Sequence, residues 1–467
     1  MNVDGSSNSH QFRNQLSQEQ VPRTQVNRSA APFLSILRHP YSSALALSLI
    51  IMGFGATFKH QSAWDRTGPG VSVMLREGRD FYANEKTFTY PPFQAWLNIP
   101  LTWMPLRAAR AIWYILSAAC LVYMIWESWR LAGGPRLEPL GEYADAKPRE
   151  HWAFVLGLIC ALQFALNSLT HLQTDLLIGA LLTAGCAAIV SRKFMRAATW
   201  IGLAAAFKCT PLLFAPYLVW KRKPIPAAWL IIIAIGANVL PNTVHAPPQR
   251  GLWLAEWSRL YLAPMERANY VPGDWKNQLD NNQSFAGAAK RWLMTTWRIA
   301  PGEFHVVDRD RHPSAAIIRW TYLLSCIVAL LIAAWAMWRR ARSKTSDATS
   351  SAGACAPRWP SRDIIECGIV LLLMVLLSPN SSRAHFCVTL LPAFCIGRFA
   401  FEEKSRWLTV LLIAAAICST LSIHIRLDAT LAAEQILLWI GVVMFAAIFL
   451  LWASVIALLH PSSRETA

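Results

Sequence analysis

The fold of this chain is constrained above all by its recurring apolar runs. The hydrocarbon core of a membrane is roughly 30 Å thick, and about 20 apolar residues cross it as a helix. About twelve runs follow one another in the sequence, at residues 40–58, 91–106, 108–129, 152–169, 174–190, 199–219, 225–242, 315–337, 364–378, 385–398, 406–423 and 432–459. Because lipid cannot satisfy backbone polar groups, such runs must be helical. The sequence therefore predicts an all-α polytopic membrane protein of about twelve transmembrane helices.

The distribution of charged residues also fits a membrane protein. The chain has 44 Lys and Arg against 27 Asp and Glu, a formal net charge of +17. Its basic residues cluster at the ends of apolar runs, as in RLAGGPR, SRKFMR and WRRARSK, which is the pattern of cytoplasmic loops in membrane proteins. We therefore attribute the charge to membrane topology and expect no binding of nucleic acid. An even number of spans, with Arg residues near both ends, places both termini in the cytoplasm.

Two runs leave the topology open. Residues 91–106 are short and begin with Tyr90-Pro91-Pro92, while residues 199–219 contain Lys208 and a proline near their middle. If both runs cross the membrane, the polar segment around Gln173 and Asp175 faces the cytoplasm, and if both turn back it faces outside. Charge counting favours turning back, because more basic residues then lie inside.

The same runs divide the chain into segments. We expect a disordered cytoplasmic tail, an amino-terminal transmembrane module with two large external loops that carry short interfacial helices, a Ser- and Ala-rich cytoplasmic linker, a carboxy-terminal transmembrane module and a short tail. These segments correspond to residues 1–39, 40–338 with external loops 59–90 and 243–314, 339–362, 363–460 and 461–467. The 10 cysteines show no C-x-x-C spacing and lie mostly inside apolar runs, which indicates buried thiols rather than disulfides or a zinc site.

The first external loop interrupts the apolar chain with charged and aromatic residues. Asp65 follows the first run closely, so its carboxylate is expected at the membrane surface, where it could act as a general base toward a hydroxyl. Asp80 is the second candidate, and Tyr82 and Tyr90 are aromatic candidates for binding a sugar or acceptor. A solvated connector with interfacial aromatic anchors is the simpler interpretation.

Lys208 lies within an apolar run, where insertion of a lysine costs roughly 2.5 to 3.5 kcal/mol. We interpret it as a phosphate-binding cation in a wet cavity, although its stem could also extend to the interface. Gln173 and Asp175 are polar candidates between two apolar runs. Their position at a connection needs no function by itself.

Further polar candidates lie in the second loop and late in the chain. Asn282 and Ser284 could hydrogen-bond sugar hydroxyls, and Arg383 with His385 suits a phosphate clamp. Asp308 and Asp310 form a D-x-D sequence, a spacing that can hold a divalent metal, but both neighbours are Arg. We expect neither a metal nor a cofactor.

The order of these motifs resembles glycosyltransferase family 87, whose members transfer sugars from polyprenyl phosphates and have the GT-C membrane fold. The resemblance covers roughly residues 40–400. In contrast to the charge count, it favours a full crossing of the membrane by both open runs. It rests on Asp65, Gly78-Arg79-Asp80-Phe81-Tyr82, Tyr90-Pro91-Pro92, Leu172-Gln173-Thr174-Asp175-Leu176-Leu177, Gly202 with Lys208 and Pro211, Asn282-Gln283-Ser284, and Ser378-Pro379-Asn380-Ser381 with His385. The chain departs from the last motif, because Ser382 and Ala384 replace a Trp and a His.

The resemblance implies a hexosyltransferase in the plasma (inner) membrane, with mannose as the favoured sugar. Asp65 would take the proton of an acceptor hydroxyl, which would displace polyprenyl phosphate with inversion on the outer face. Lys208, Arg383 and His385 would neutralise the leaving phosphate. The expected partners are the polyprenyl-phosphate sugar, a lipid or glycan acceptor and membrane lipids.

Two other classes of protein share the large loops and the apolar runs. A flippase or transporter of lipid-linked sugars would place charges inside many spans and contain related halves, neither of which the sequence shows. A ligase or polymerase of lipid-linked oligosaccharides would depend on Arg267 or His305 of the second loop rather than on Asp65.

Overall fold

The computed structural model describes most of the apolar chain and its loops. The described residues are 40–60, 62–134, 148–249, 251–267, 269–273, 281–300, 303–309, 313–343, 360–422 and 431–460. The predicted tails and most of the predicted linker lie outside these ranges.

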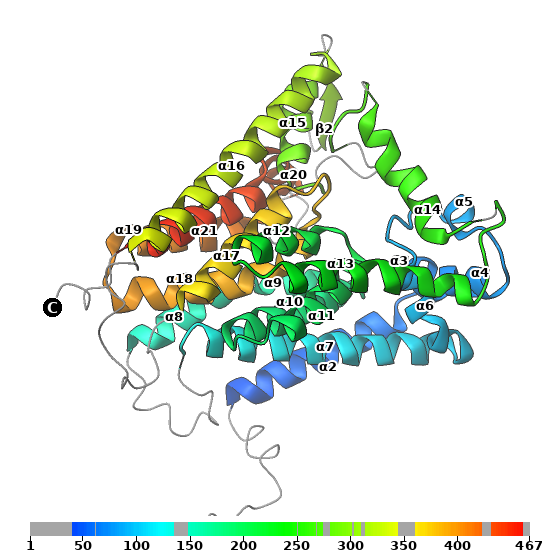
Figure 1. Ribbon diagram of the computed structural model, residues 1–467, viewed down its shortest axis with the longest axis horizontal. Helices are drawn as coiled ribbons and strands as arrows, with labels where there is room; N and C mark the ends of the chain where they lie inside the picture. Colours follow the sequence, from blue (N-terminus) through cyan, green and yellow to red (C-terminus); the bar gives the residue numbers. More distant parts are fainter. Residues whose placement is uncertain are drawn as a thin grey trace, which may run out of the picture.

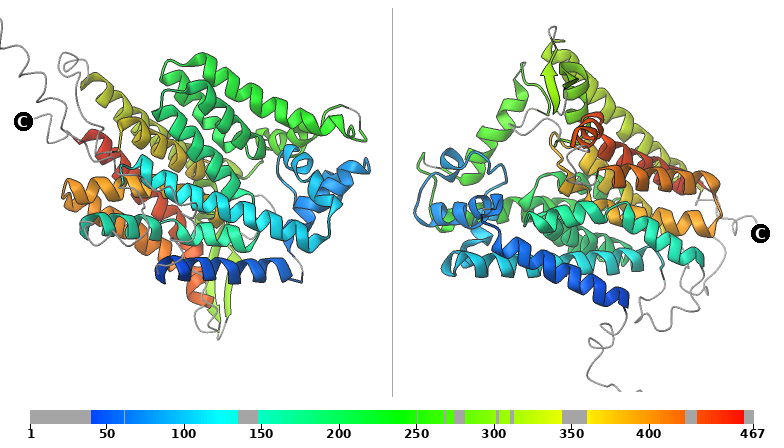
Figure 2. Two further views of the ribbon diagram at one scale, coloured as in Figure 1. Left: turned by 90° about the horizontal axis from the view of Figure 1, so that it is seen from below. Right: turned by 180° about the vertical axis from the view of Figure 1, so that it is seen from behind.

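The longer helices form one bundle, and shorter elements gather at one end of it (Figure 1). The helices of the bundle are α2 (Pro40–Phe58), α7 (Leu106–Leu131), α8 (Pro148–Ile159), α9 (Leu162–Thr170), α10 (Asp175–Val190), α11 (Phe194–Phe207), α12 (Phe214–Trp220), α13 (Pro224–Val239), α16 (Ala315–Ser343), α17 (Arg362–Leu376), α18 (Leu390–Glu402), α19 (Arg406–Leu421), α20 (Leu431–Ile440) and α21 (Val442–Leu459). The chain enters α2 and leaves α21 at the end of the bundle opposite the short elements (Figure 2).

Five of the described helices are long and apolar enough to cross a membrane, or six if α8 and α9, which meet at 43°, are one span. Five more apolar helices are shorter than 18 residues. The structure therefore supports a polytopic membrane protein and does not confirm the count of about twelve spans. The clearest departure is at 91–106, where prolines break the run into α6 (Phe93–Leu97) and a 3-10 turn, Ile99–Trp103.

The run at 199–219 breaks at Lys208 and turns back. Lys223, which follows this run, lies 4.9 Å from the ring of Phe194, at the start of α11. The carboxylate of Asp363 likewise contacts both Arg192, before α11, and Lys221, after α12. The chain thus returns to the level at which α11 began, and Lys208 lies at the turning point.

Turning back also brings the 172–175 segment to the loop end of the bundle. Asp175 begins α10 and pairs with Lys208 at that turning point, and Lys208 Nζ lies 5.7 Å from the ring of Tyr90 in the first loop. The chain therefore takes the turned-back course that charge counting favours, not the full crossing that the family resemblance favours.

The two predicted transmembrane modules share one hydrophobic core. Helix α18 packs against α7 and α8, which precede it by more than half the chain, and against α19 and α21. Buried residues of both segments belong to the same cluster, among them Phe164, Phe386 and Phe394. The carboxy-terminal helices are therefore interleaved with the amino-terminal ones.

The external loops contain short elements, as predicted. The first loop forms α3 (Ala63–Asp65), a π-turn (Arg66–Gly70), α4 (Val71–Arg76) and α5 (Phe81–Asn84), and the second forms α14 (Trp253–Trp257), α15 (Phe285–Met294), β1 (Thr295–Ala300) and β2 (Glu303–Asp308). The strands pair antiparallel, with Thr295 opposite Asp308. This hairpin corrects the expectation of a purely α-helical chain.

An aromatic cluster fastens the two loops together. Phe81 stacks on Trp253 with 4.2 Å between ring centroids, and Trp257 donates a hydrogen bond from Nε1 to the carbonyl of Thr89. Tyr261 donates from its hydroxyl to the carbonyl of Phe88. The loops therefore form one rigid cap over the end of the bundle where Lys208 lies.

A close approach of two helices fixes α18 against α8. A methyl group at Gly397 would lie 2.8 Å from the carbonyl oxygen of Ala153, closer than real Cβ contacts allow. A methyl group added at Gly236, in α13, would have no atom within 4 Å. The first glycine permits the contact, whereas the second has no such role.

We expect Gly397→Ala to destabilise the protein by about 1–3 kcal/mol, because the added methyl forces the helices apart. Gly236→Ala should be neutral or stabilise by up to about 1 kcal/mol, since alanine is the better helix former. Thermal unfolding in detergent measures both. An unchanged unfolding temperature for Gly397→Ala would contradict the close packing.

Candidate active site

The candidate site is centred on Lys208. Helix α11 ends at Phe207, and Lys208 has an extended backbone before a 3-10 turn that contains Pro211. The Lys208 Nζ atom lies 3.0 Å from Asp175 Oδ1 and contacts His385 Nε2. Three predicted site residues from three different segments therefore meet.

The hydrogen bonding of His385 fixes which way its proton points. Its Nδ1 accepts the backbone N–H of Ser382 at 3.2 Å, so the proton of a neutral ring is on Nε2. That Nε2 faces Lys208 and lies 3.7 Å from Asp175 Oδ1. The ammonium of Lys208 and the N–H of His385 therefore face each other as two donors, with Asp175 Oδ1 as the acceptor beside them. An anion bound between the two donors would accept from both, so the arrangement is suited to an anion.

Other polar groups surround this point. The Tyr90 ring lies 5.7 Å from Lys208 Nζ, and burial, followed by the charge of Asp175, raises the pKa of the Tyr90 hydroxyl. Gln173 Oε1 and Asp175 Oδ2 are buried and have no hydrogen-bond partner among the residues that the structure describes. Since buried polar atoms are almost always satisfied, these two are available to a ligand.

The space between these side chains is small. A cavity of about 10 Å³, enough for about one water molecule, is lined by Asp175, Ile178, Lys208, Thr210, Met374, Val375, Ser381, His385 and Val388. A phosphate group would have to displace the Asp175 carboxylate from Lys208 to enter here.

The second loop holds this region in place through Asn282. Its Oδ1 accepts hydrogen bonds from the backbone N–H groups of Ser381 and Ser284 and from the Ser284 hydroxyl, at 2.8–3.2 Å. Its Nδ2 donates to the carbonyl of Pro379 at 2.9 Å. Ser284 also caps α15 by accepting the N–H of Gly287. Both side chains therefore make hydrogen bonds within the protein that support the site, and their predicted contact with a sugar stays a prediction.

Asp65 lies at the start of the first loop and is held by a residue that sequence reasoning missed. Arg110 donates from Nε to Asp65 Oδ1 at 2.8 Å and from Nη2 to Asp65 Oδ2 at 2.5 Å, and the backbone N–H of Ser62 donates to Oδ2 at 2.8 Å. The third nitrogen of Arg110 bonds to backbone carbonyls at the end of α2. A carboxylate has about four lone-pair sites, so one remains for a substrate hydroxyl.

Two tryptophans connect Asp65 to the Lys208 group. Trp64 packs on Trp113 with 5.6 Å between centroids, and Trp113 Nε1 donates to the carbonyl of Leu172 at 3.0 Å. Leu172 has a positive φ of 55°, which turns the chain before Gln173 and Asp175. The carboxylate of Asp65 and the Lys208 group therefore lie on one continuous framework at the loop end of the bundle.

Three other predicted residues do not join this group. Arg383 pairs with Glu434 at 2.9 Å. Asp80 caps α5 by accepting the N–H of Ala83, and it also accepts a hydrogen bond from Gln249. Tyr82 is buried in the aromatic cluster and donates to the carbonyl of Tyr90.

The remaining candidates are the residues that could bind a metal ion, above all Asp308 and Asp310 of the D-x-D sequence. The described residues contain no group of three or more His, Cys, Asp or Glu side chains placed to hold a metal ion. Asp310 lies outside the described residues, as does the side chain of Asp308. The expectation that the D-x-D sequence holds no metal stays a prediction.

Arg110 was missed although the sequence carries a signal for it. It lies in LRAARAIW, within the first turns of a long apolar run, where a cation needs a partner. The nearest carboxylate before that run is in the first loop. If the run 91–106 crossed the membrane, Arg110 and Asp65 would lie on opposite sides of it. Predicting their pairing would therefore have required knowing that this run does not cross.

Comparisons with known proteins agree with the placement of these motifs. Residues 88–356 match the sequence model of glycosyltransferase family 87, a range that includes Tyr90, Asp175 and Lys208 and excludes Asp65 and His385.

Two curated relatives and one solved structure were also found. A polyprenol-phosphate-mannose-dependent α-(1-2)-phosphatidylinositol mannoside mannosyltransferase of Mycolicibacterium smegmatis is 26% identical over 72% of this chain and 69% of its own length. A polyprenol-phosphate-mannose-dependent α-(1-2)-phosphatidylinositol pentamannoside mannosyltransferase of Mycobacterium tuberculosis is 27% identical over 33% of each chain. The crystal structure of ArnT from Cupriavidus metallidurans bound to undecaprenyl phosphate covers 89% of this chain and 76% of its own, with 13% identity and a TM-score of 0.32, which is too low to support an argument.

The hydrogen bonds of Asn282 generate a test of its supporting role. We expect Asn282→Ala to destabilise the protein by about 1–3 kcal/mol, because it leaves buried N–H groups of Ser284 and Ser381 without a partner. The exposed Asn84, whose side chain makes one hydrogen bond to the carbonyl of Asp80, provides a control in Asn84→Ala. Thermal unfolding distinguishes the two, and equal effects would contradict a special role for Asn282.

Proposed function

We propose that this chain, which belongs to glycosyltransferase family 87, transfers a hexose, mannose in the first instance, from a polyprenyl-phosphate donor to a lipid or glycan acceptor on the outer face of the membrane. The observation that carries the proposal is the convergence of Lys208, His385 and Asp175 beneath the external loops. The names of the two mycobacterial relatives support the donor and the sugar.

The cationic pair suits a lipid-linked phosphate. When the donor enters, its phosphate replaces Asp175 as the partner of Lys208 and accepts the Nε2–H of His385. Because phosphate is a good leaving group, these donors neutralise it without a general acid. Asp175, released from Lys208, then accepts hydrogen bonds from the sugar, and the unoccupied Gln173 amide oxygen accepts a sugar hydroxyl.

Asp65 serves as the general base in this proposal. An acceptor hydroxyl donates its proton to a free lone pair of Asp65, its oxygen bonds to the anomeric carbon, and the bond from that carbon to the phosphate oxygen breaks. A single displacement of this kind inverts the anomeric configuration. Arg110 keeps the carboxylate in a fixed orientation through its two parallel hydrogen bonds.

The direction of the bundle supports the location of the reaction. The Arg192 and Lys221 ends of the helices lie opposite the loop end, and basic residues mark the cytoplasmic side. The site then faces outward in the plasma membrane, and both termini are cytoplasmic.

The first experiment measures transfer of radiolabelled mannose from polyprenyl phosphate to membrane lipids by the purified protein. We expect Asp65→Asn to reduce the rate by about 10²–10⁴-fold, because it removes the base. Asp80→Asn is the matched control, since Asp80 caps α5, and it should retain most activity. Insensitivity to EDTA is expected throughout.

Each outcome of this experiment decides between hypotheses. Transfer by Asp65→Asn at the wild-type rate would overturn the assignment of Asp65 as the base and make Asp80 the next candidate. An inactive wild-type protein, tested with mannose and with other sugars, would contradict the transferase and favour a flippase.

The second experiment measures binding of polyprenyl phosphate, the product. We expect Lys208→Gln to weaken binding by about 10–100-fold, because a charged hydrogen bond to phosphate is lost. Lys208→Arg should retain most of the affinity, and Lys86→Gln, at an exposed lysine of the first loop, should leave it unchanged. Equal affinity of wild type and Lys208→Gln would place the phosphate elsewhere.

A further inference from the structure

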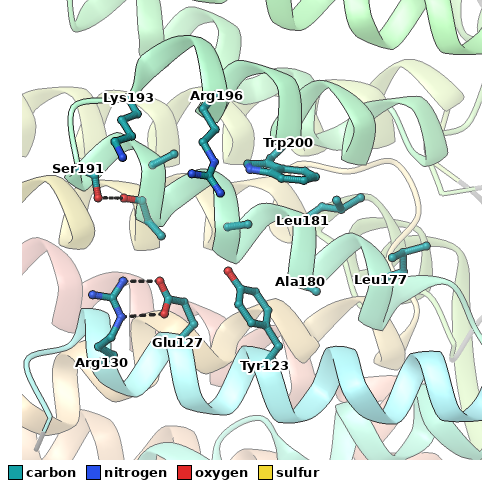
Figure 3. Close-up of a pocket in the computed structure, with 13 residues that line it drawn as sticks. Tyr123, Glu127, Arg130, Leu177, Ala180, Leu181, Ser191, Lys193, Arg196 and Trp200 are labelled. Carbon is teal, nitrogen blue, oxygen red and sulfur yellow. Dashed lines mark hydrogen bonds and ion pairs between the residues drawn. The ribbon is translucent and has the colours of Figure 1, made fainter. Parts of the chain in front are cut away.

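A second hollow lies on the opposite side of α10 from the candidate active site. This cavity, which we name the α10 groove, has a volume of about 490 Å³ and lies between α7, α10 and α11 (Figure 3). Its lining residues are Tyr123, Glu127, Arg130, Leu177, Ala180, Leu181, Ala184, Ala187, Ala188, Ser191, Lys193, Arg196 and Trp200. The volume is within the range of small-molecule sites, roughly 300–1,000 Å³.

The position of the lining residues on α10 separates the groove from the active site. Leu177, Ala180, Leu181, Ala184 and Ala188 recur at three- and four-residue spacing and so share one face of the helix. At 100° per residue, that face lies roughly opposite the one from which Asp175 points to Lys208. The groove follows α10 for most of its length, about 20 Å, and its alanine side chains leave an apolar channel.

One end of the groove is cationic. Lys193 and Arg196 are exposed and line it at the start of α11, and neither forms an ion pair with a carboxylate in the part of the chain that the structure describes. A third cation, Arg130, is balanced by Glu127, to which it donates at 2.8 and 2.5 Å. The basic end therefore carries two uncompensated positive charges.

Figure 3 shows how the groups are arranged at this end. Arg196 from α11 and the hydroxyl of Tyr123 from α7 point into the space between the helices, and the indole of Trp200 lies beside them. An aromatic ring with a polar edge next to cations is typical of the membrane interface. The apolar channel then extends from that interface toward the middle of the bundle.

We propose that the α10 groove binds an anionic phospholipid of the leaflet opposite the active site. Its phosphate and acidic headgroup contact Lys193 and Arg196, and one acyl chain occupies the channel along Ala180, Ala184 and Ala188. Basic pockets between transmembrane helices are known to select anionic headgroups. A free phosphate ion would leave the apolar channel empty, and a zwitterionic lipid would leave the two positive charges uncompensated.

The test is native mass spectrometry of the full-length protein in detergent, titrated with dioleoyl phosphatidylglycerol or dioleoyl phosphatidylcholine. We expect phosphatidylglycerol to bind the wild type more tightly than phosphatidylcholine. The double variant Lys193→Gln/Arg196→Gln should bind phosphatidylglycerol about 30-fold more weakly, from two lost charges near the surface. The control Lys404→Gln/Arg406→Gln removes two exposed cations from the turn between α18 and α19, outside the groove, and should bind as the wild type does.

A second variant separates the apolar channel from the charges. Ala184→Leu narrows the channel and leaves both cations intact, so it should weaken the binding of phosphatidylglycerol. In a separate competition, inorganic phosphate at millimolar concentration should displace no bound lipid. Unfolding temperatures equal to that of the wild type verify that the variants are folded. Equal binding of both lipids, or equal loss in the Lys404 control, would overturn the proposal.

Discussion

The ion pair between Lys208 and Asp175 is the interaction on which the functional end of the molecule depends. Taking two charges out of water costs several kcal/mol per ion, and the cost is offset only with good geometry and further hydrogen bonds. Here the pair joins the end of α11 to the start of α10, and His385 brings the start of a third helical segment to the same point. The pair thus connects three segments of the chain. One oxygen of its carboxylate, Asp175 Oδ2, has no hydrogen-bond partner in the described structure. An arrangement that a bound anion can rearrange is suited to binding and releasing a charged lipid head.

The remaining motifs support that connection from outside it. Asn282 connects the second loop to the segment before His385, and the aromatic cluster around Phe81 connects the second loop to the first. The first loop in turn contains Asp65, which Arg110 ties to the start of α7. Each connection uses hydrogen bonds or stacked rings rather than apolar contact alone, so the cap has a defined geometry. A site built this way holds the Asp65 carboxylate and the Lys208 group at a fixed separation.

Much of this could be predicted from the sequence, and the exceptions have physical causes. Lys208 was identified because a charge inside an apolar run is costly, and Asp175 because it is a polar residue between two such runs. Their pairing was not predicted. The hydrogen bonds of Asn282 could not be predicted, because an amide can donate and accept equally well to a sugar or to the backbone, and the sequence does not show which partners it meets. The partner of Arg383, Glu434, lies 51 residues away in a separate helix, a distance over which no local pattern operates. The break at 91–106 was foreseen as a possibility from its prolines. The turning back of 199–219 was also foreseen as a possibility, but deciding it needed the contacts of Lys221 and Arg192 with Asp363.

The contact of Gly397 with Ala153 has a consequence for the synthesis of the protein. The two positions are separated by about 240 residues, and at about 5–20 residues per second the ribosome needs at least about 12 s to produce the second after the first. Throughout that interval α8 lies in the bilayer with the surface for α18 uncovered. Until α18 is made, the surface of α8 that it will cover therefore contacts lipid or an insertion factor. A chain truncated before α18 cannot complete the hydrophobic core around its amino-terminal helices.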